Sequence, residues 1–178
     1  MEKQPQVWTI GHSTQPVDEF IAVSKSFEIE ALVDVRSFPG SRRYPQYNKE
    51  QLRAALEKVG VQYLHLPKLG GRRRAKPDSI NMAWRNEMFR GYADHMESTE
   101  FREGIADLLN IARLQRTAIM CAEAVWWRCH RSLISDYLKV EGIEITHIMR
   151  VGKSEPHPFT TAARIVNGRL SYRGVLDG

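Results

Sequence analysis

The sequence predicts an α/β fold with three layers, in which a mostly parallel sheet is flanked by helices and a β-hairpin is appended near the C-terminal end. Apolar, strand-like runs alternate along the chain with longer stretches of helical period, which is typical of a parallel α/β domain. The run ALVDV (31–35) is nearly continuously apolar, as expected for a strand that is covered on both faces. Near the end, Asn167-Gly168 joins two β-rich arms and predicts a hairpin over 163–172, which would cap the sheet or belong to a partner surface.

The first half of the chain supplies three strands and two helices. Pro16 suits the first turn of a helix, Asn48 suits the residue before a helix, and Gly60 suits the position just after one. We therefore expect strands at 6–11, 31–35 and 61–66, and helices at 16–27 and 49–59.

The second half begins with a stretch that is harder to interpret. Residues 67–97 are polar and rich in Arg and Gly, and we expect an insertion with one short helix there. Ser98 then caps a helix whose apolar residues recur at three and four positions. The remaining elements expected are a helix at 99–115, a buried strand at 117–121, a helix at 129–141 that Gly142 closes, and a strand at 143–149.

Length and composition favour one soluble domain that spans residues 1–178. No run of about 18 apolar residues is present, so we expect no membrane span, and the first residues lack the pattern of a secretory signal. Two cysteines are too few for a secreted disulfide scaffold, which makes the cytoplasm the expected compartment. The sequence predicts no cofactor and leaves the oligomeric state open.

The charge balance is moderately basic and uneven. The chain has 26 Lys and Arg against 21 Asp and Glu, a net charge of +5, and residues 68–76 (KLGGRRRAK) carry five cations and no anion. Such a segment attracts an anionic small molecule or a nucleic acid, although a solvated loop without a ligand has the same composition.

Polar and reactive side chains follow nearly every predicted strand. Ligands of an open parallel sheet bind outside the carboxyl ends of its strands, so these side chains predict a site at that edge. Simpler roles stay open for several of them: a turn or helix cap, a structural ion pair between Asp34 and Arg36, a histidine satisfied at a strand end, and glycines that serve only a turn. The residues concerned are His12, Ser13, Asp34, Arg36, Ser41, Gly70, Gly71, Cys121, Glu123 and His147.

Both cysteines lie in one segment, MCAEAVWWRCHRS (120–132). Cys121 ends a buried strand, where cysteine behaves as a small hydrophobic residue. Cys129 is expected at the start of a helix, beside Arg128, His130 and Arg131, and a helix N-terminus and cations both lower a thiol pKa. The segment has no Cys-x-x-Cys and too few ligands for zinc, and it does not match the spacing of cysteine phosphatases. Two roles for these cysteines remain, a nucleophile or a redox pair.

Several of these motifs, taken in order, resemble a prokaryotic family described as domain of unknown function 488. The resemblance covers roughly residues 7–150 and implies an α/β fold with a shared site, but no particular reaction. It is carried by Thr9-Ile10-Gly11-His12-Ser13, Asp34-Val35-Arg36 with Pro39 and Ser41, Leu69-Gly70-Gly71, Cys121-Ala122-Glu123, Cys129-His130-Arg131 and His147.

Three functions fit these residues. The first is a hydrolase or transferase that acts on a phosphate-bearing or otherwise anionic substrate, such as a nucleotide or a nucleic-acid component. Its catalytic candidates are Cys129, Glu123, His12, Cys121 and Asp34, and its substrate-binding candidates are Ser13, Arg36, Ser41, Gly70, Gly71, Arg72, Arg73, Arg128, His130, Arg131 and His147. The second is a nucleic-acid-binding module that uses the Arg-rich loop with Trp84, Trp126 or Trp127. The third is a redox-sensing or partner-docking protein that uses the cysteine pair.

Overall fold

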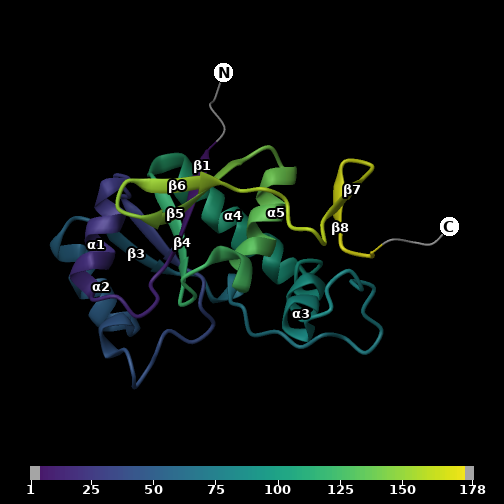
Figure 1. Ribbon diagram of the computed structural model, residues 1–178, viewed down its shortest axis with the longest axis horizontal. Helices are drawn as coiled ribbons and strands as arrows, with labels where there is room; N and C mark the ends of the chain where they lie inside the picture. The colour runs from purple at the N-terminus through teal and green to yellow at the C-terminus, as the bar shows by residue number, and fades with distance from the viewer. Residues whose placement is uncertain (1–4, 175–178) are drawn as a thin grey trace.

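The computed structural model describes residues 5–174 and contains a six-stranded sheet with the strand order β3-β2-β4-β1-β5-β6 (Figure 1). The first five of these strands in the chain are parallel, and β6 pairs antiparallel with β5. The predicted fold class is confirmed. The strands are β1 (Gln6–Gly11), β2 (Ala31–Asp34), β3 (Gln62–His65), β4 (Thr117–Cys121), β5 (Glu144–Arg150) and β6 (Lys153–Pro156).

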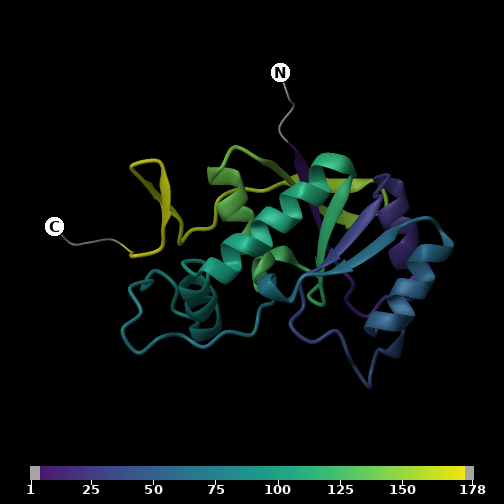
Figure 2. The same cartoon turned by 180° about the vertical axis from the view of Figure 1, so that it is seen from behind.

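Helices cover both faces of this sheet. One face carries α1 and α2, and the other carries α4, the long helix that crosses the sheet in Figure 2, together with α3 and α5. The helices are α1 (Val17–Ser26), α2 (Lys49–Lys58), α3 (Glu87–His95), α4 (Thr99–Leu114) and α5 (Arg131–Val140), with short 3₁₀ helices η1 (Pro45–Tyr47), η2 (Pro67–Leu69) and η3 (Trp126–Arg128). Among residues 5–174 no helix is both long and apolar enough to cross a membrane.

Side chains alternate between the two faces along each central strand, as the two-residue period of a strand requires. In β4, Ile119 and Cys121 pack with the α4 and α5 layer, whereas Ala118 and Met120 pack with the α1 and α2 layer. This alternation also assigns each strand-end residue to one of the two faces.

Most predicted helix ends agree with the structure to within two residues. Ser98 caps α4, since its Oγ accepts a hydrogen bond of 3.1 Å from the backbone N–H of Phe101. The Asn48 side chain instead accepts from the backbone N–H of Ser41, 2.5 Å away, and so ties the loop after β2 to the start of α2. The α5 helix begins at Arg131 rather than at Cys129, because η3 occupies the preceding residues.

The C-terminal hairpin is confirmed and consists of β7 (Arg164–Val166) and β8 (Arg169–Ser171). Asn167 and Gly168 have φ angles of 52° and 76°, as a two-residue turn of the primed type requires. The hairpin stands apart from the main sheet at one end of the molecule in Figures 1 and 2. Leu170 and Tyr172 anchor it against the apolar layer that contains α5.

Candidate functional site

The connections of the sheet create a crevice between β1 and β4. From β1 the chain passes through α1 to β2 on one side, and from β4 it passes through α5 to β5 on the other. Open α/β sheets bind ligands at such a switch point. Here the two strand ends are level, because Gly11 pairs with Cys121 and the backbone N–H of His12 donates to the carbonyl of Cys121 at 3.0 Å.

A pocket of about 340 Å³ opens at this crevice, within the usual size range of small-molecule sites. Ten of the predicted site residues line it: His12, Arg36, Ser41, Gly71, Arg72, Cys121, Glu123, Arg128, Cys129 and His130. Its apolar wall was not predicted and comes from Phe38, Tyr44, Met88 and Phe89, on the loop after β2 and on α3.

The two cysteines lie side by side at the base of the pocket. Their Sγ atoms are 2.9 Å apart, both thiols are free, and both residues are buried. The guanidinium of Arg131 donates from Nε to both sulfur atoms, at 3.1 Å to Cys121 and 3.2 Å to Cys129. The backbone N–H of Arg131 also points at the Cys129 sulfur, 3.3 Å away. The single positive charge of Arg131 therefore lies against both sulfur atoms.

The two thiols differ in acidity. Burial would raise the pKa of Cys129, but the hydrogen bond from Cys121 and the charge of Arg131 outweigh it and bring this pKa well below its ordinary value of 9.0. Burial raises the pKa of Cys121 well above that value, and the neighbouring Cys129 sulfur raises it further. Within the pair, Cys129 is therefore the more acidic thiol, and Cys121 is the one that more readily keeps its proton and can donate it to the Cys129 sulfur.

Arg131 does not line the pocket. The sequence placed it among the substrate-binding residues, but only 1% of its surface is exposed. Its Nη1 donates to Thr9 Oγ1 at 3.2 Å and its Nη2 to the carbonyl of Glu123 at 2.7 Å. Because α5 begins at this residue, its side chain turns inward beneath the sulfur atoms. Arg131 is thus an electrostatic partner of the thiols rather than a group that reaches the pocket.

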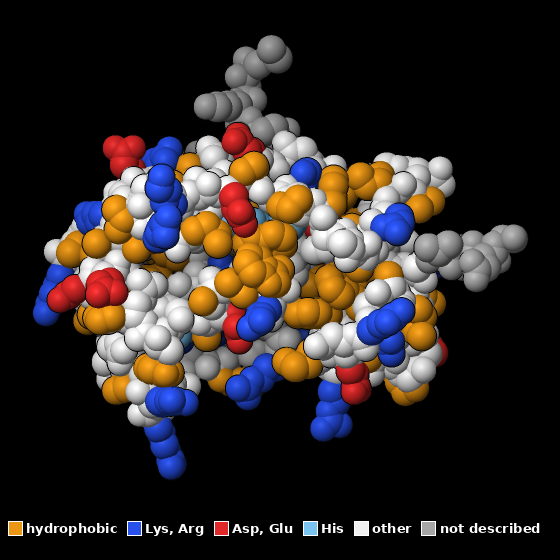
Figure 3. All heavy atoms as spheres, viewed as in Figure 1, with side chains coloured by type: hydrophobic (Ala, Val, Ile, Leu, Met, Phe, Trp, Pro, Cys, Tyr) orange, Lys and Arg blue, Asp and Glu red, His pale blue; other side chains and the backbone are white. Residues whose placement is uncertain are grey.

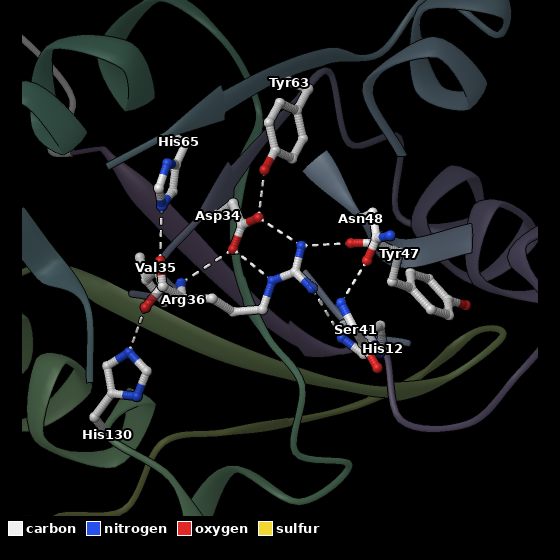
Figure 4. A network of polar contacts seen from close by, with 10 residues as sticks. All are labelled: His12, Asp34, Val35, Arg36, Ser41, Tyr47, Asn48, Tyr63, His65 and His130. Atoms are coloured by element: carbon white, nitrogen blue, oxygen red, sulfur yellow. Dashed lines mark hydrogen bonds and ion pairs between the residues drawn. The ribbon is translucent and has the colours of Figure 1, made fainter. Parts of the chain in front are cut away.

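A second polar network occupies the α1 and α2 face of the crevice (Figure 4). The Asp34 carboxylate accepts from Arg36 Nε at 2.9 Å and Nη2 at 2.7 Å, and Tyr63 donates to it as well. Arg36 Nη2 also donates to the carbonyl of Tyr47 at 2.8 Å. Asp34 is fully buried and does not line the pocket, so the two residues form the structural ion pair that the sequence left open.

His12 belongs to this second network, and both of its ring nitrogens are engaged. Nδ1 donates to the carbonyl of Ser13 at 2.8 Å, which leaves Nε2 to accept from Arg36 Nη1 at 3.3 Å. The ring stacks on Tyr47 with centroids 4.1 Å apart. Burial lowers the pKa of His12 to about 4, and the Arg36 charge acts in the same direction. His12 is therefore a neutral ring with both nitrogens occupied.

His130 has one ring nitrogen, Nδ1, that makes no hydrogen bond with any of the residues 5–174. Its Nε2 donates to the carbonyl of Val35 at 2.7 Å (Figure 4). Nδ1 therefore carries a lone pair, and it lies on the side of Gly71. Burial lowers the pKa of His130, and the ring is neutral at pH 7. Gly71 packs tightly against it, because a Cβ there would lie 2.4 Å from Nδ1. Gly70 packs in the same way against Ser37 and does not reach the pocket.

Two arginines stand at the mouth of the pocket. Arg72 is exposed and lies over the ring of Phe38, 5.7 Å from its centroid, and Arg128 is exposed as well. Arg73, by contrast, pairs with Glu100 at 3.4 Å and donates to backbone carbonyls. Figure 3 shows hydrophobic side chains gathered over the segment between β4 and α5, with Lys and Arg along the lower edge of that face.

The remaining predicted residues lie elsewhere. His147 is fully buried inside the α5 layer, where it stacks on Trp126 with centroids 4.4 Å apart, so the expectation that it reaches the sheet edge is wrong. Ser13 lines a neighbouring hollow of about 440 Å³. Of the three tryptophans considered for stacking, Trp126 is buried, Trp84 is half-buried and Trp127 is 49% exposed. Within residues 5–174 no three His, Cys, Asp or Glu side chains cluster in a way that could hold a metal ion.

Comparison with known proteins identifies the family. A family model described as domain of unknown function DUF488 matches residues 16–138, more than half of the chain. Searches of curated proteins and of solved structures gave no match. The matched span runs from α1 to α5 and so includes Asp34, Arg36, Gly71 and both cysteines. The chain belongs to the DUF488 family.

Proposed function

We propose that this protein is a thiol-dependent enzyme of the hydrolase or transferase type, which acts on a small anionic substrate through covalent catalysis at Cys129. The observation that carries this proposal is the thiol pair at the base of the pocket. A buried arginine contacts both sulfur atoms and lowers the pKa of Cys129, and a lowered pKa is what makes a cysteine nucleophilic at neutral pH.

The lining of the pocket indicates what it would bind. Arg72 and Arg128 are exposed where the pocket opens, and arginine forks match the oxygen atoms of phosphate and carboxylate groups. Phe38, Met88 and Phe89 offer an apolar wall beside them. A molecule that joins an anionic group to an apolar or aromatic part, such as a nucleotide, satisfies both halves.

The chemistry uses Cys129 and His130, which both line the pocket. The Cys129 thiolate attacks an electrophilic carbon or phosphorus atom, a bond from that atom to sulfur forms, and the leaving group departs with the electron pair of its own bond. His130 Nδ1 then accepts a proton from the water or alcohol that attacks the adduct, and the thiolate is released. Cys121 keeps its proton and supports the thiolate throughout.

Two alkylating reagents test the proposal without knowledge of the substrate. Iodoacetate is an anion and iodoacetamide is its neutral analogue, so the ratio of their rates at Cys129 measures the preference of the pocket for an anion. We expect iodoacetate to be favoured in the native protein relative to the unfolded chain, and Arg72→Gln with Arg128→Gln to remove this preference. Arg74→Gln is the control, because Arg74 is exposed outside the pocket lining. A native ratio equal to the unfolded ratio would refute the anion site.

The distance of 2.9 Å between the sulfur atoms favours a second candidate, a dithiol–disulfide exchange enzyme. In that reaction Cys129 attacks a disulfide substrate and releases one thiolate, and Cys121 then attacks the Cys129 sulfur and releases the other. Two electrons pass from the protein to the substrate, and Cys121 and Cys129 become a disulfide. With an aromatic anionic disulfide such as 5,5′-dithiobis(2-nitrobenzoate), the native protein would release two thiolates and Cys121→Ser only one. Release of one thiolate by the native protein would rule this candidate out.

A further inference from the structure

A line of buried polar side chains runs from the thiol pair into the interior on the α5 face of the sheet. Thr9 Oγ1 lies 2.6 Å from His147 Nδ1, and His147 Nε2 lies 2.8 Å from His157 Nδ1. His157 Nε2 in turn lies 2.8 Å from Asp136 Oδ1. All four residues are at most 3% exposed, and none of them lines the pocket. The line joins the cation Arg131 to the carboxylate of Asp136.

The protons in this line can be placed from its two ends. Arg131 has only donors, so Thr9 Oγ1 accepts from Nη1 and its own hydrogen goes to His147 Nδ1. His147 then donates from Nε2 to His157 Nδ1, which leaves His157 Nε2–H to donate to Asp136. Every hydrogen bond points the same way, from the guanidinium to the carboxylate. Such chains are polarised by their charged ends, and each bond strengthens its neighbours.

Both ends of the line are held firmly. Asp136 also accepts from the Tyr172 hydroxyl at 2.7 Å and from the backbone N–H of Thr160 at 3.0 Å, so it stays in place without Arg131. His147 is fixed by its stacking on Trp126. Burial and the neighbouring His157 lower the pKa of His147 to about 2, which keeps its ring neutral and the proton order intact. The line is therefore a rigid support that ends on Nη1 of Arg131.

We propose that Thr9, His147, His157 and Asp136 are positioning residues that hold the Arg131 guanidinium against the sulfur atoms of Cys121 and Cys129. The inference rests on the thiol site of the proposed function and names the residues that hold this site in place. Without the Thr9 hydroxyl, one buried N–H group of Arg131 loses its acceptor. The guanidinium would then turn to find another, and its Nε would leave the sulfur atoms that it now shares.

The experiment compares Thr9→Val, which keeps the shape of the side chain and removes its hydroxyl, with Thr9→Ser, which keeps the hydroxyl. Alkylation of Cys129 by iodoacetamide is followed against pH, since this neutral probe reports the thiolate fraction. We expect the apparent thiol pKa to rise by about one unit in Thr9→Val, so that alkylation below that pKa is roughly tenfold slower, and to stay unchanged in Thr9→Ser. Ser135→Ala is a matched control, because it removes a buried hydroxyl on α5 that has no hydrogen-bond partner within the described part of the chain.

His147→Phe provides a second break in the line and keeps a ring that can stack on Trp126. The same rise of the pKa in every one of these two variants that folds supports the inference. An unchanged pH profile of alkylation in a folded Thr9→Val or His147→Phe variant overturns the inference. Failure of both variants to fold, while Thr9→Ser folds, also overturns it, because these residues would then stabilise the fold and nothing more. An ordinary thiol pKa in the unaltered protein would contradict the proposed function instead, so the two failures are distinguishable.

Discussion

Replacing Asp34 by alanine should destabilise the fold severely, because the change leaves a buried charge without its partner. The carboxylate accepts from the backbone N–H of Arg36 at 3.0 Å and from its Nε and Nη2 at 2.9 and 2.7 Å, and the Tyr63 hydroxyl adds a fourth contact. The Arg36 side chain is only 11% exposed, so little water reaches it to replace the carboxylate. Breaking a buried ion pair by removing one partner costs about 3–5 kcal/mol of the free energy of unfolding.

Equilibrium unfolding in urea, followed by circular dichroism, measures this loss as a fall in the midpoint at an unchanged slope. The exposed pair of Arg53 and Glu50, 3.6 Å apart on α2, supplies the control. Glu50→Ala should cost no more than about 1 kcal/mol, as is usual for surface pairs. The double variant Asp34→Leu with Arg36→Met should recover much of the loss, since it removes both charges. A loss for Asp34→Ala no larger than for Glu50→Ala would refute the reasoning.

Three further predictions concern the pocket and its surroundings. The pKa of buried His12 falls from 6.5 to about 4, so the unfolded chain binds more protons between these values and the free energy of unfolding should decrease as the pH is lowered through them. His12→Asn should reduce the slope of the free energy of unfolding against pH by up to about 1.4 kcal/mol per pH unit, as measured by urea unfolding at several pH values. Parallel plots for the variant and the unaltered protein would contradict this. In Gly71→Ala the added methyl group would lie only 2.4 Å from His130 Nδ1, so the imidazole should move and the alkylation of Cys129 should slow. Gly40→Ala should leave the rate unchanged, because a Cβ there meets open space. If the protein binds nucleic acid, neutralising residues 72–74 should flatten the salt dependence of binding, and an unchanged slope would remove this loop from the binding surface.

Much of the fold could be predicted because its elements are marked locally. The strand bounds 6–11 and 117–121 match β1 and β4, and Ser98 marks the start of α4. The β6 strand was missed because it is short, polar and exposed, so it lacks the apolar pattern of the central strands. The α5 start was placed two residues early, since the η3 turn before it has no clear sequence signal.

The site was predictable as far as topology and residue chemistry reach. The rule for parallel sheets brought His12, Glu123 and both cysteines to one edge, and the pocket lies there. The direction in which Arg131 points depends on where α5 begins, which the sequence placed wrongly. His147 was expected at the edge, although its strand runs three residues further and its side chain faces the interior.

Contacts between distant parts of the chain were beyond sequence reasoning. Thr9 stands 122 positions from Arg131 and 138 from His147, and no local pattern marks such pairs. Thr9 carries one weak signal, because it shares the face of β1 with Val7, but a buried threonine alone suggests nothing. The apolar wall from Met88 and Phe89 belongs to the stretch whose structure the sequence left least defined.

The long sequence separations between Thr9, Arg131 and His147 bear on when, during folding, the thiol site of the proposed function is assembled. The two cysteines are only eight positions apart, but Arg131, which contacts both sulfur atoms, is bonded to Thr9 on β1, the first strand made. Thr9 in turn contacts His147 on β5, the last parallel strand. Contacts of such long range form late, because closing long loops is slow. If Cys129 is the nucleophile that we propose, a chain emerging from the ribosome would carry two ordinary thiols, and Cys129 would gain its reactivity only when the fold is complete. The alkylation rate of Cys129 would then report whether the chain has folded correctly.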